Sequence, residues 1–187
     1  MSTVNGWDAA YCPDPIPEGY TYAKVYIGGS SAYRVWTAAE RARVSSMRVM
    51  PIWVPTPGTD NPRQVAIQAA DVLKSIGVPA FERPFRALMW DLETGREPDP
   101  GWLTTAANTM ASLGYDNLIY GSVDGSGLFS YPQRLGYVVP DPTGEPHMYN
   151  HAGVVETQYA QNVSVPGGQV DLDMLDDSIL PHLGTIK

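Results

Sequence analysis

Two acidic residues stand two positions apart at the end of an apolar segment. Residues 87–93 read Ala-Leu-Met-Trp-Asp-Leu-Glu, which predicts a buried strand ending in Asp91 and Glu93. Positions i and i+2 of a strand face the same side, so the two carboxyl groups should converge. Like charges in a low-dielectric site favour protonation of one, which a general acid acting on a glycosidic oxygen requires. The pair predicts such chemistry, although acids after a strand also serve as helix caps or solvated loop residues.

Further acids follow the first and last predicted strands. Asp8 lies near the end of the segment 4–9, and Asp171 and Asp173 alternate with apolar residues in 169–173. In a closed barrel the first and last strands are neighbours, so Asp8 and a late aspartate would meet near Asp91 and Glu93. Side chains at the carboxyl ends of barrel strands build the active sites of that fold. Four carboxyl groups are therefore expected at one mouth.

Eight predicted strands have to position these acids: 4–9, 22–27, 48–54, 86–92, 117–121, 135–139, 154–159 and 169–173. Three helices are predicted by capping signals, which begin at Thr37 with Glu40, at Asn61 with Pro62, and at Asp99 with Pro100. Gly77 and Gly114 are placed to end the last two helices. Helices confined to the first part favour an α/β fold with an abbreviated TIM-type barrel, in a single domain spanning 1–187. An open doubly wound sheet would give the same local pattern.

Composition excludes several classes of function. A formal net charge of -8 disfavours a nucleic-acid partner. Cys12 is the only cysteine, so an internal disulfide is impossible, and His147, His151 and His182 lack metal-ligand spacing. We expect no metal and no cofactor. Residues 1–11 have no signal-peptide pattern and no segment is apolar enough to span a membrane, so the expectation is a soluble protein without membrane association.

Five motifs together resemble the glycoside hydrolase family 25 lysozymes and related glycoside-hydrolase-like barrels of actinobacteria and their phages. In chain order the motifs are Gly6-Trp7-Asp8, Trp90-Asp91-Leu92-Glu93, Ile119-Tyr120-Gly121, Gln158-Tyr159-Ala160 and Val170-Asp171-Leu172-Asp173. The resemblance covers nearly the whole chain and implies five βα units followed by three strands. Departures occur in segment 51–54, where the lysozymes usually carry a Tyr-His-Phe-like run, and at Gly28-Gly29.

The resemblance implies muramidase chemistry, which is cleavage of the β-1,4 bond between N-acetylmuramic acid and N-acetylglucosamine in peptidoglycan. It implies that Glu93 donates a proton to the leaving oxygen and that Asp91 stabilises the 2-acetamido group or the oxocarbenium-like transition state. Asp8 and Asp171 would hold the charge and hydrogen bonding of the site. A retaining or an inverting outcome is left open at this stage.

Aromatic residues at predicted strand ends are candidates for stacking on sugar rings. Trp53 and Tyr120 are the first choices, and Tyr26 and Gln158 complete the expected substrate-binding set. Core packing is the competing role for such aromatic residues.

Three functions are compatible with these patterns. The first is an active peptidoglycan glycosidase, released from the cytoplasm of a phage-infected cell or associated with the virion. The second is a non-catalytic virion protein, such as a minor tail or capsid-associated component, that uses the barrel for glycan binding or for assembly with other virion proteins. The third is an envelope protein of the host that binds glycan without cleaving it.

Overall fold

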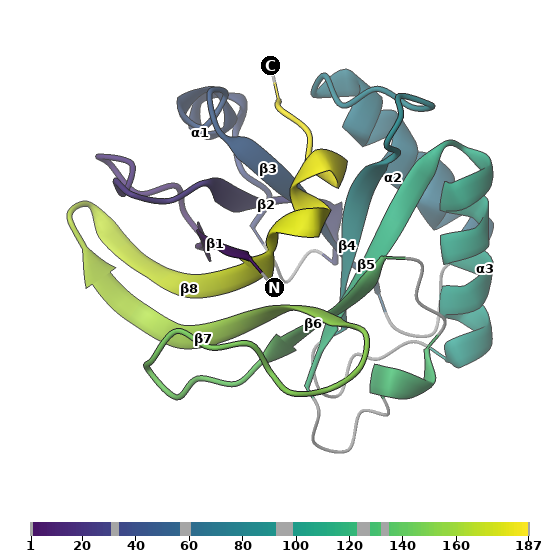
Figure 1. The fold of residues 1–187 in the computed structure, drawn as a ribbon. Helices are drawn as coiled ribbons and strands as arrows, with labels where there is room; N and C mark the ends of the chain where they lie inside the picture. The colour runs from purple at the N-terminus through teal and green to yellow at the C-terminus, as the bar shows by residue number, and fades with distance from the viewer. Residues whose placement is uncertain are drawn as a thin grey trace.

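Eight strands form a closed barrel in the order of the chain. The computed structural model describes residues 2–30, 34–56, 61–92, 99–122, 128–131 and 135–186. The strands are β1 (Thr3–Asp8), β2 (Tyr22–Gly29), β3 (Arg48–Val54), β4 (Arg86–Leu92), β5 (Tyr115–Gly121), β6 (Gly136–Pro140), β7 (Val154–Val165) and β8 (Gly168–Asp176) (Figure 1). The closed order confirms the barrel and rules out the open doubly wound sheet.

Strand direction determines which residues meet at each end of the barrel. Neighbouring strands from β1 to β7 are parallel, whereas β8 is antiparallel to both β7 and β1. The carboxyl ends of β1 to β7 therefore meet at one end, which we call the mouth. Because β8 runs the other way, its early residues lie there, and Asp8 of β1 pairs with Asp171 of β8.

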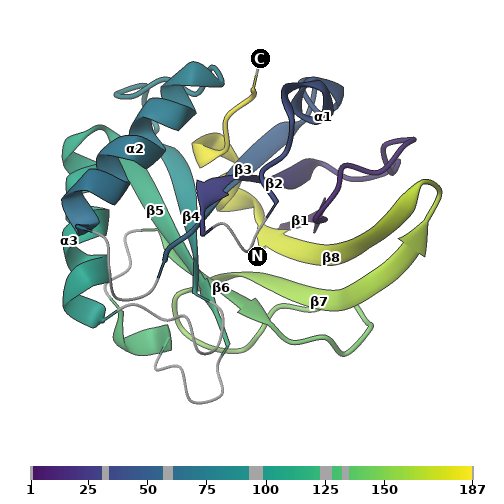
Figure 2. The same ribbon diagram turned by 180° about the vertical axis from the view of Figure 1, so that it is seen from behind.

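Three α-helices occur where the capping signals predicted them: α1 (Ala38–Arg43), α2 (Pro62–Ser75) and α3 (Pro100–Ser112). Thr37 and Glu40 form the expected capping box, and Asn61 and Asp99 cap the other two helices. Helices α2 and α3 lie on one side of the barrel, away from the long β7–β8 hairpin (Figure 2). The five helical connections implied by the resemblance are not all present, because residues 9–21 between β1 and β2 contain no helix.

The strands alternate between two apolar layers, as period-2 side-chain geometry requires. Their outward residues, among them Val25, Leu88 and Ile119, pack with α2 and α3 residues such as Leu73 and Leu103 in an outer core. The inward strand residues form a separate inner core, which comprises Tyr22, Met50, Ile52, Val54, Ala87, Met89, Leu118, Val138 and Leu175. The barrel is thus a filled core rather than a pore.

The end opposite the mouth is closed by the C-terminal segment. A short 3-10 helix, η2 (Asp177–His182), places Ile179 and Leu183 in the inner core. Arg86 at the start of β4 donates hydrogen bonds from Nη1 to the carbonyl oxygens of Pro181 (2.6 Å) and Leu183 (3.1 Å). A second short 3-10 helix, η1 (Leu128–Ser130), lies between β5 and β6. Closure by η2 leaves the mouth as the end where polar inward side chains can meet solvent.

Gly6 is required by close packing inside the barrel. A Cβ atom at Gly6 would lie 2.2 Å from Cζ of Tyr22, whose ring is fully buried. We therefore expect Gly6→Ala to lower the free energy of unfolding by about 1–3 kcal/mol, the usual cost of overpacking. Urea unfolding would measure it, with Gly168→Ala as the control, because a Cβ there meets only Pro13 at 3.9 Å. Equal stability of Gly6→Ala and the native protein would contradict this account.

Candidate active site

Eight polar or aromatic side chains from six strands surround the mouth. They line one small cavity of about 90 Å³ and comprise Asp8, Lys24, Tyr26, Asp91, Tyr120, Gln158, Gln161 and Asp171. Asp8, Asp91 and Gln158 are each at most 5% exposed. The sequence-based expectation that Asp8, Asp91 and a late aspartate share one mouth agrees with this arrangement.

Strand register explains why these residues meet. Asp91 follows Met89 by two positions on β4, so both face the interior, and Asp91 pairs with Tyr120 on β5. Asp8 and Asp171 pair across the β1–β8 seam. The two regions come together only because β8 closes the barrel against β1.

Gln158 on β7 connects the carboxylates of the mouth. Its Nε2 donates to Oδ2 of Asp8 (3.1 Å) and to Oδ2 of Asp171 (3.2 Å). Its Oε1 accepts from the Tyr120 hydroxyl (3.1 Å) and from Nε2 of Gln161 (3.0 Å). The amide therefore separates two like charges and fixes their spacing, which is a more specific role than the substrate contact expected from the sequence.

Lys24 lies fully buried directly beneath the mouth, within a cluster of three carboxyl groups. Its Nζ is 2.7 Å from Asp173 Oδ1, 2.9 Å from Glu156 Oε1 and 3.0 Å from Asp8 Oδ2. Glu156 and Asp173 are also fully buried, so these charges have no solvent to screen them. The ammonium group offsets part of the negative charge of the three acids. Asp8 Oδ2 is thus held by two partners, Nζ of Lys24 and Nε2 of Gln158.

Burial raises the pKa values of Glu156, Asp171 and Asp173, which shifts these three acids toward their protonated forms. Burial, opposed by Lys24, raises the pKa of Asp173 well above its usual range and also raises the pKa of Glu156. At the mouth, burial and then the charge of Asp8 raise the pKa of Asp171. Burial acts to lower the pKa of Lys24, but the three carboxylates outweigh it and raise that pKa well above its ordinary value. Lys24 is therefore a permanent cation that faces more carboxyl groups than it can neutralise.

The aromatic side chains of the mouth are neutral over the physiological range. Burial raises the pKa of Tyr26 and of Tyr120 well above 10, and the nearby aspartates add to the effect. The Tyr120 ring also lies 5.7 Å from Nζ of Lys24. Both tyrosines line the mouth, as expected from the sequence, and Tyr120 has the defined task of orienting the Gln158 amide.

One described residue expected in the site, Trp53, is not part of this geometry. Trp53 faces the outer core, is 7% exposed, and packs against Gly28, where a Cβ would lie 2.3 Å from its ring. It borders neither described cavity, so a stacking role for Trp53 is not retained; alternation along β3 places Ile52, not Trp53, toward the mouth. Glu93 lies outside the described residues, and its role stays a prediction.

The sequence-based site omitted Lys24 and Glu156, and it named Asp173 only as an alternative to Asp171. A signal for Lys24 was present, because it lies two residues from both Tyr22 and Tyr26 on a predicted strand and must share their inward face. A lysine is rarely assigned to a core position because a buried charge needs a partner. Its partners come from β1, β7 and β8, which no local pattern identifies.

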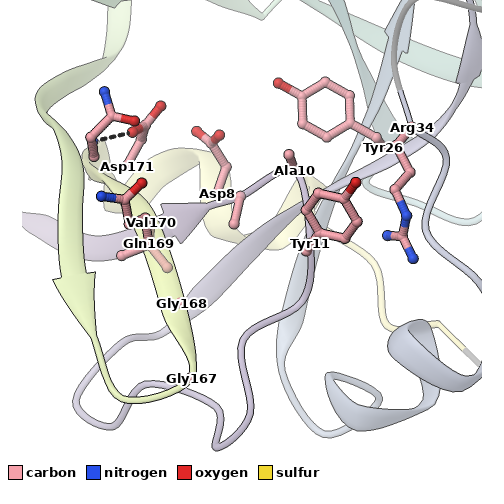
Figure 3. A pocket seen from close by; sticks show the side chains of 12 residues that line it. Asp8, Ala10, Tyr11, Tyr26, Arg34, Gly167, Gly168, Gln169, Val170 and Asp171 are labelled. Atoms are coloured by element: carbon pink, nitrogen blue, oxygen red, sulfur yellow. Dashed lines mark hydrogen bonds between the residues drawn. The ribbon is translucent and has the colours of Figure 1, made fainter.

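The mouth continues into a larger cleft of about 730 Å³, which we call the side cleft. Asp8, Tyr26 and Asp171 line both cavities. One wall of the side cleft is the β7–β8 hairpin near Gly168 and the opposite wall includes Tyr11 (Figure 3). The carboxylates of the mouth thus stand at one end of an accessible groove.

The sequence of this chain matches no described family, whereas its fold matches known structures. No protein-family model matches the chain, and no curated protein matches its sequence.

Solved structures do match along nearly all of the chain. The catalytic domain of endolysin ply40 from bacteriophage P40 of Listeria monocytogenes superposes with a TM-score of 0.68 at 12% identity, covering 96% of each chain. A family 25 glycosyl hydrolase from Bacillus anthracis superposes with a TM-score of 0.64 at 14% identity, covering 92% of this chain and 88% of that one. The chain has the fold of the family 25 lysozymes.

An uncharacterized protein of B. stearothermophilus has the same lysozyme-like fold, with a TM-score of 0.72 at 15% identity over 97% of this chain and 100% of that one. At these identities the similarity concerns the fold alone. The resemblance expected from the five motifs is confirmed at that level. In the part of this lysozyme-like barrel that the structure describes, no helix is long and apolar enough to cross a membrane.

Proposed function

We propose that this protein is a peptidoglycan glycosidase of the muramidase type, which hydrolyses the β-1,4 bond between N-acetylmuramic acid and N-acetylglucosamine. The observation that carries the proposal is the convergence of Asp8, Asp91 and Asp171 in one cavity at the carboxyl end of a lysozyme-like barrel, where Asp8 and Asp171 also line the side cleft. Carboxyl groups on either side of a glycosidic bond are the catalytic equipment of most glycosidases.

Each acid has a distinct proposed role. Glu93, two residues after Asp91 in the sequence, is our proposed general acid. Asp91 stabilises the positive charge that develops on the sugar or its acetamido group. Asp8, held between Lys24 and Gln158, supplies a fixed charge, and Asp171, with its raised pKa, offers a hydrogen bond whose direction depends on pH.

The biological setting that we propose is the lysis of a bacterial cell by a phage. The endolysin domain from phage P40 covers this chain almost from end to end, which supports an enzyme that reaches peptidoglycan from an infected cell or a virion. Peptidoglycan is the proposed partner, and other virion proteins are partners only if the protein is carried on the particle.

The test is hydrolysis of purified actinobacterial peptidoglycan between pH 4 and pH 8. We expect the native protein to clear the suspension and to release fragments whose new reducing ends are N-acetylmuramic acid. Loss of a general acid costs about 10²–10⁴-fold in rate, so Glu93→Gln should clear at that fraction of the native rate. The exposed residue Glu82 provides the matched control, since it precedes the amino end of β4, opposite the mouth, and Glu82→Gln changes the same functional group there.

Two outcomes would contradict the proposal. Clearing by Glu93→Gln at the native rate would remove Glu93 from the mechanism. If the folded native protein releases no fragments at any pH, the muramidase function is wrong and a non-catalytic virion protein becomes the better assignment.

A further inference from the structure

The cavity that the described residues leave at the mouth is smaller than a glycan-binding site requires. Its cavity of about 90 Å³ equals roughly three water molecules at about 30 Å³ each. The side cleft, at about 730 Å³, falls within the about 300–1,000 Å³ that is usual for small-molecule sites. A glycan cleaved by the mouth acids therefore needs space in the side cleft, beyond Asp8 and Asp171.

The far wall of the side cleft presents an exposed aromatic ring. Tyr11 is 65% exposed, although large apolar side chains of this chain are mostly buried. The guanidinium group of Arg34 lies over the Tyr11 ring at 4.2 Å from its centroid. Both residues line the cleft, and they stand on the opposite side of it from Gln169 and Asp171 (Figure 3). The ring is oriented by the cation and still accessible to a ligand.

This wall is held in place from below. Glu40 at the start of α1 accepts from Nη1 of Arg34 (2.7 Å) and from the backbone N–H of Cys12 (3.3 Å). The Arg34 contact, with added hydrogen bonds from Thr37, lowers the pKa of Glu40 to about 2, so the carboxylate stays charged at neutral pH. The Glu40 side chain therefore holds both Arg34 and the backbone next to Tyr11, so the Tyr11 ring has a fixed position in the wall of the cleft.

The opposite wall of the side cleft is formed by the tip of the β7–β8 hairpin and is polar. A Cβ atom at Gly167 would lie 2.1 Å from the carbonyl oxygen of Asp14, so the tip approaches the β1–β2 segment as only glycine allows. Gly168 and Gln169 then line the cleft with backbone and an amide group. Gln169 and the backbone of Gly168 offer uncharged hydrogen-bonding groups beside the carboxyl group of Asp171, and they face an aromatic ring. Such a pair of walls suits an amide-bearing pyranose, whose C–H face packs on the ring and whose acetamido group meets the amide and backbone groups.

We propose that the side cleft is a second saccharide subsite, in which Tyr11 stacks against an N-acetylhexosamine one or more units away from the cleaved bond. This inference rests on the proposed function for its substrate, a β-1,4-linked glycan. It predicts that longer oligosaccharides bind more tightly than a disaccharide, and that Tyr11 accounts for much of the difference.

The test is calorimetric titration with the β-1,4-linked hexamer and dimer of N-acetylglucosamine. An aromatic contact of about 0.5–1.5 kcal/mol corresponds to about 2- to 12-fold in affinity. We expect Tyr11→Ala to weaken hexamer binding by this factor, while Tyr11→Phe keeps the native affinity. Phe81→Ala is the control, because Phe81 is 66% exposed but lies beside Gly114, at the end of the barrel opposite the mouth.

Equal hexamer affinity of Tyr11→Ala and the native protein would overturn the subsite, as would absence of hexamer binding by the native protein. These results are separable from failure of the proposed function. Hexamer binding that depends on Tyr11, without cleavage of peptidoglycan, would support the subsite and reject the muramidase. Cleavage of peptidoglycan with no effect of Tyr11→Ala would do the reverse.

Discussion

Lys24→Met is expected to cost about 3–5 kcal/mol of unfolding free energy at neutral pH, the usual effect of removing one partner from a buried ion pair. The substitution leaves Asp8, Glu156 and Asp173 facing one another in the interior without their shared cation. Methionine fills a similar volume, so the loss would come from charge rather than from a cavity. Urea unfolding of the variant and the native protein at pH 7 measures the difference.

The loss should depend on pH in a defined direction. Without the lysine, the folded-state pKa values of Glu156 and Asp173 rise beyond the already raised native ones. A group with a raised folded-state pKa contributes stability that is complete below its unfolded pKa and is lost as the pH rises through the folded value. Lys24→Met should therefore be relatively more stable near pH 4 than near pH 7.

Two further variants make this result specific. Adding Glu156→Gln to Lys24→Met removes one of the uncompensated charges and should restore part of the stability at pH 7. Lys74→Met is the control, because Lys74 is exposed and forms only a 3.5 Å surface pair with Asp71. A Lys24→Met protein as stable as the native one at pH 7 would mean that the cluster does not need its cation.

The second large effect is expected from Asp91→Asn, which should reduce peptidoglycan clearing by about 10²–10³-fold with little change in unfolding temperature. The substitution preserves shape but removes the charge proposed to stabilise the transition state, and loss of one such group has about this cost. Clearing rates and thermal unfolding, measured on the same preparations, separate chemistry from folding.

Asp99→Asn is the matched control for this measurement. Asp99 caps α3 through a 3.0 Å hydrogen bond from the Gly101 N–H, and asparagine caps a helix equally well. The control should therefore clear at the native rate. Native-rate clearing by Asp91→Asn would exclude Asp91 from the mechanism, whereas a large drop in unfolding temperature would show that its charge serves the fold.

Local patterns predicted most of the elements of this barrel. β3 and β4 have the bounds that their apolar runs predicted, and Thr37, Asn61 and Asp99 cap helices as expected. The largest difference is the hairpin, since β7 continues to Val165 beyond the predicted 154–159. The register of β7 against β8 shifts between Gln158 and Ala160 and again between Ala160 and Val163, which interrupts the alternation, while pairing with β8 continues the strand.

Local side-chain periodicity also predicted part of the site. Asp91 follows an apolar strand, and the i+2 rule places it inward with Met89, whereas Trp53 was misplaced because an aromatic residue at a strand end can face either layer. The charge cluster depends on three strands far from Lys24 in sequence. Its closest contact joins residues 149 positions apart, a separation over which no periodicity carries information.

The sequence by itself determined the strands, the helix caps and the inward direction of Asp8 and Asp91, because these follow from the period of side chains along one segment. Closure of β8 against β1 decided the rest. That closure pairs Asp8 with Asp171, brings Glu156 and Asp173 around Lys24, and sets the β7–β8 hairpin across the cleft from Tyr11. Electrostatics and cavity shape depend on distances between strands, which only the tertiary structure specifies.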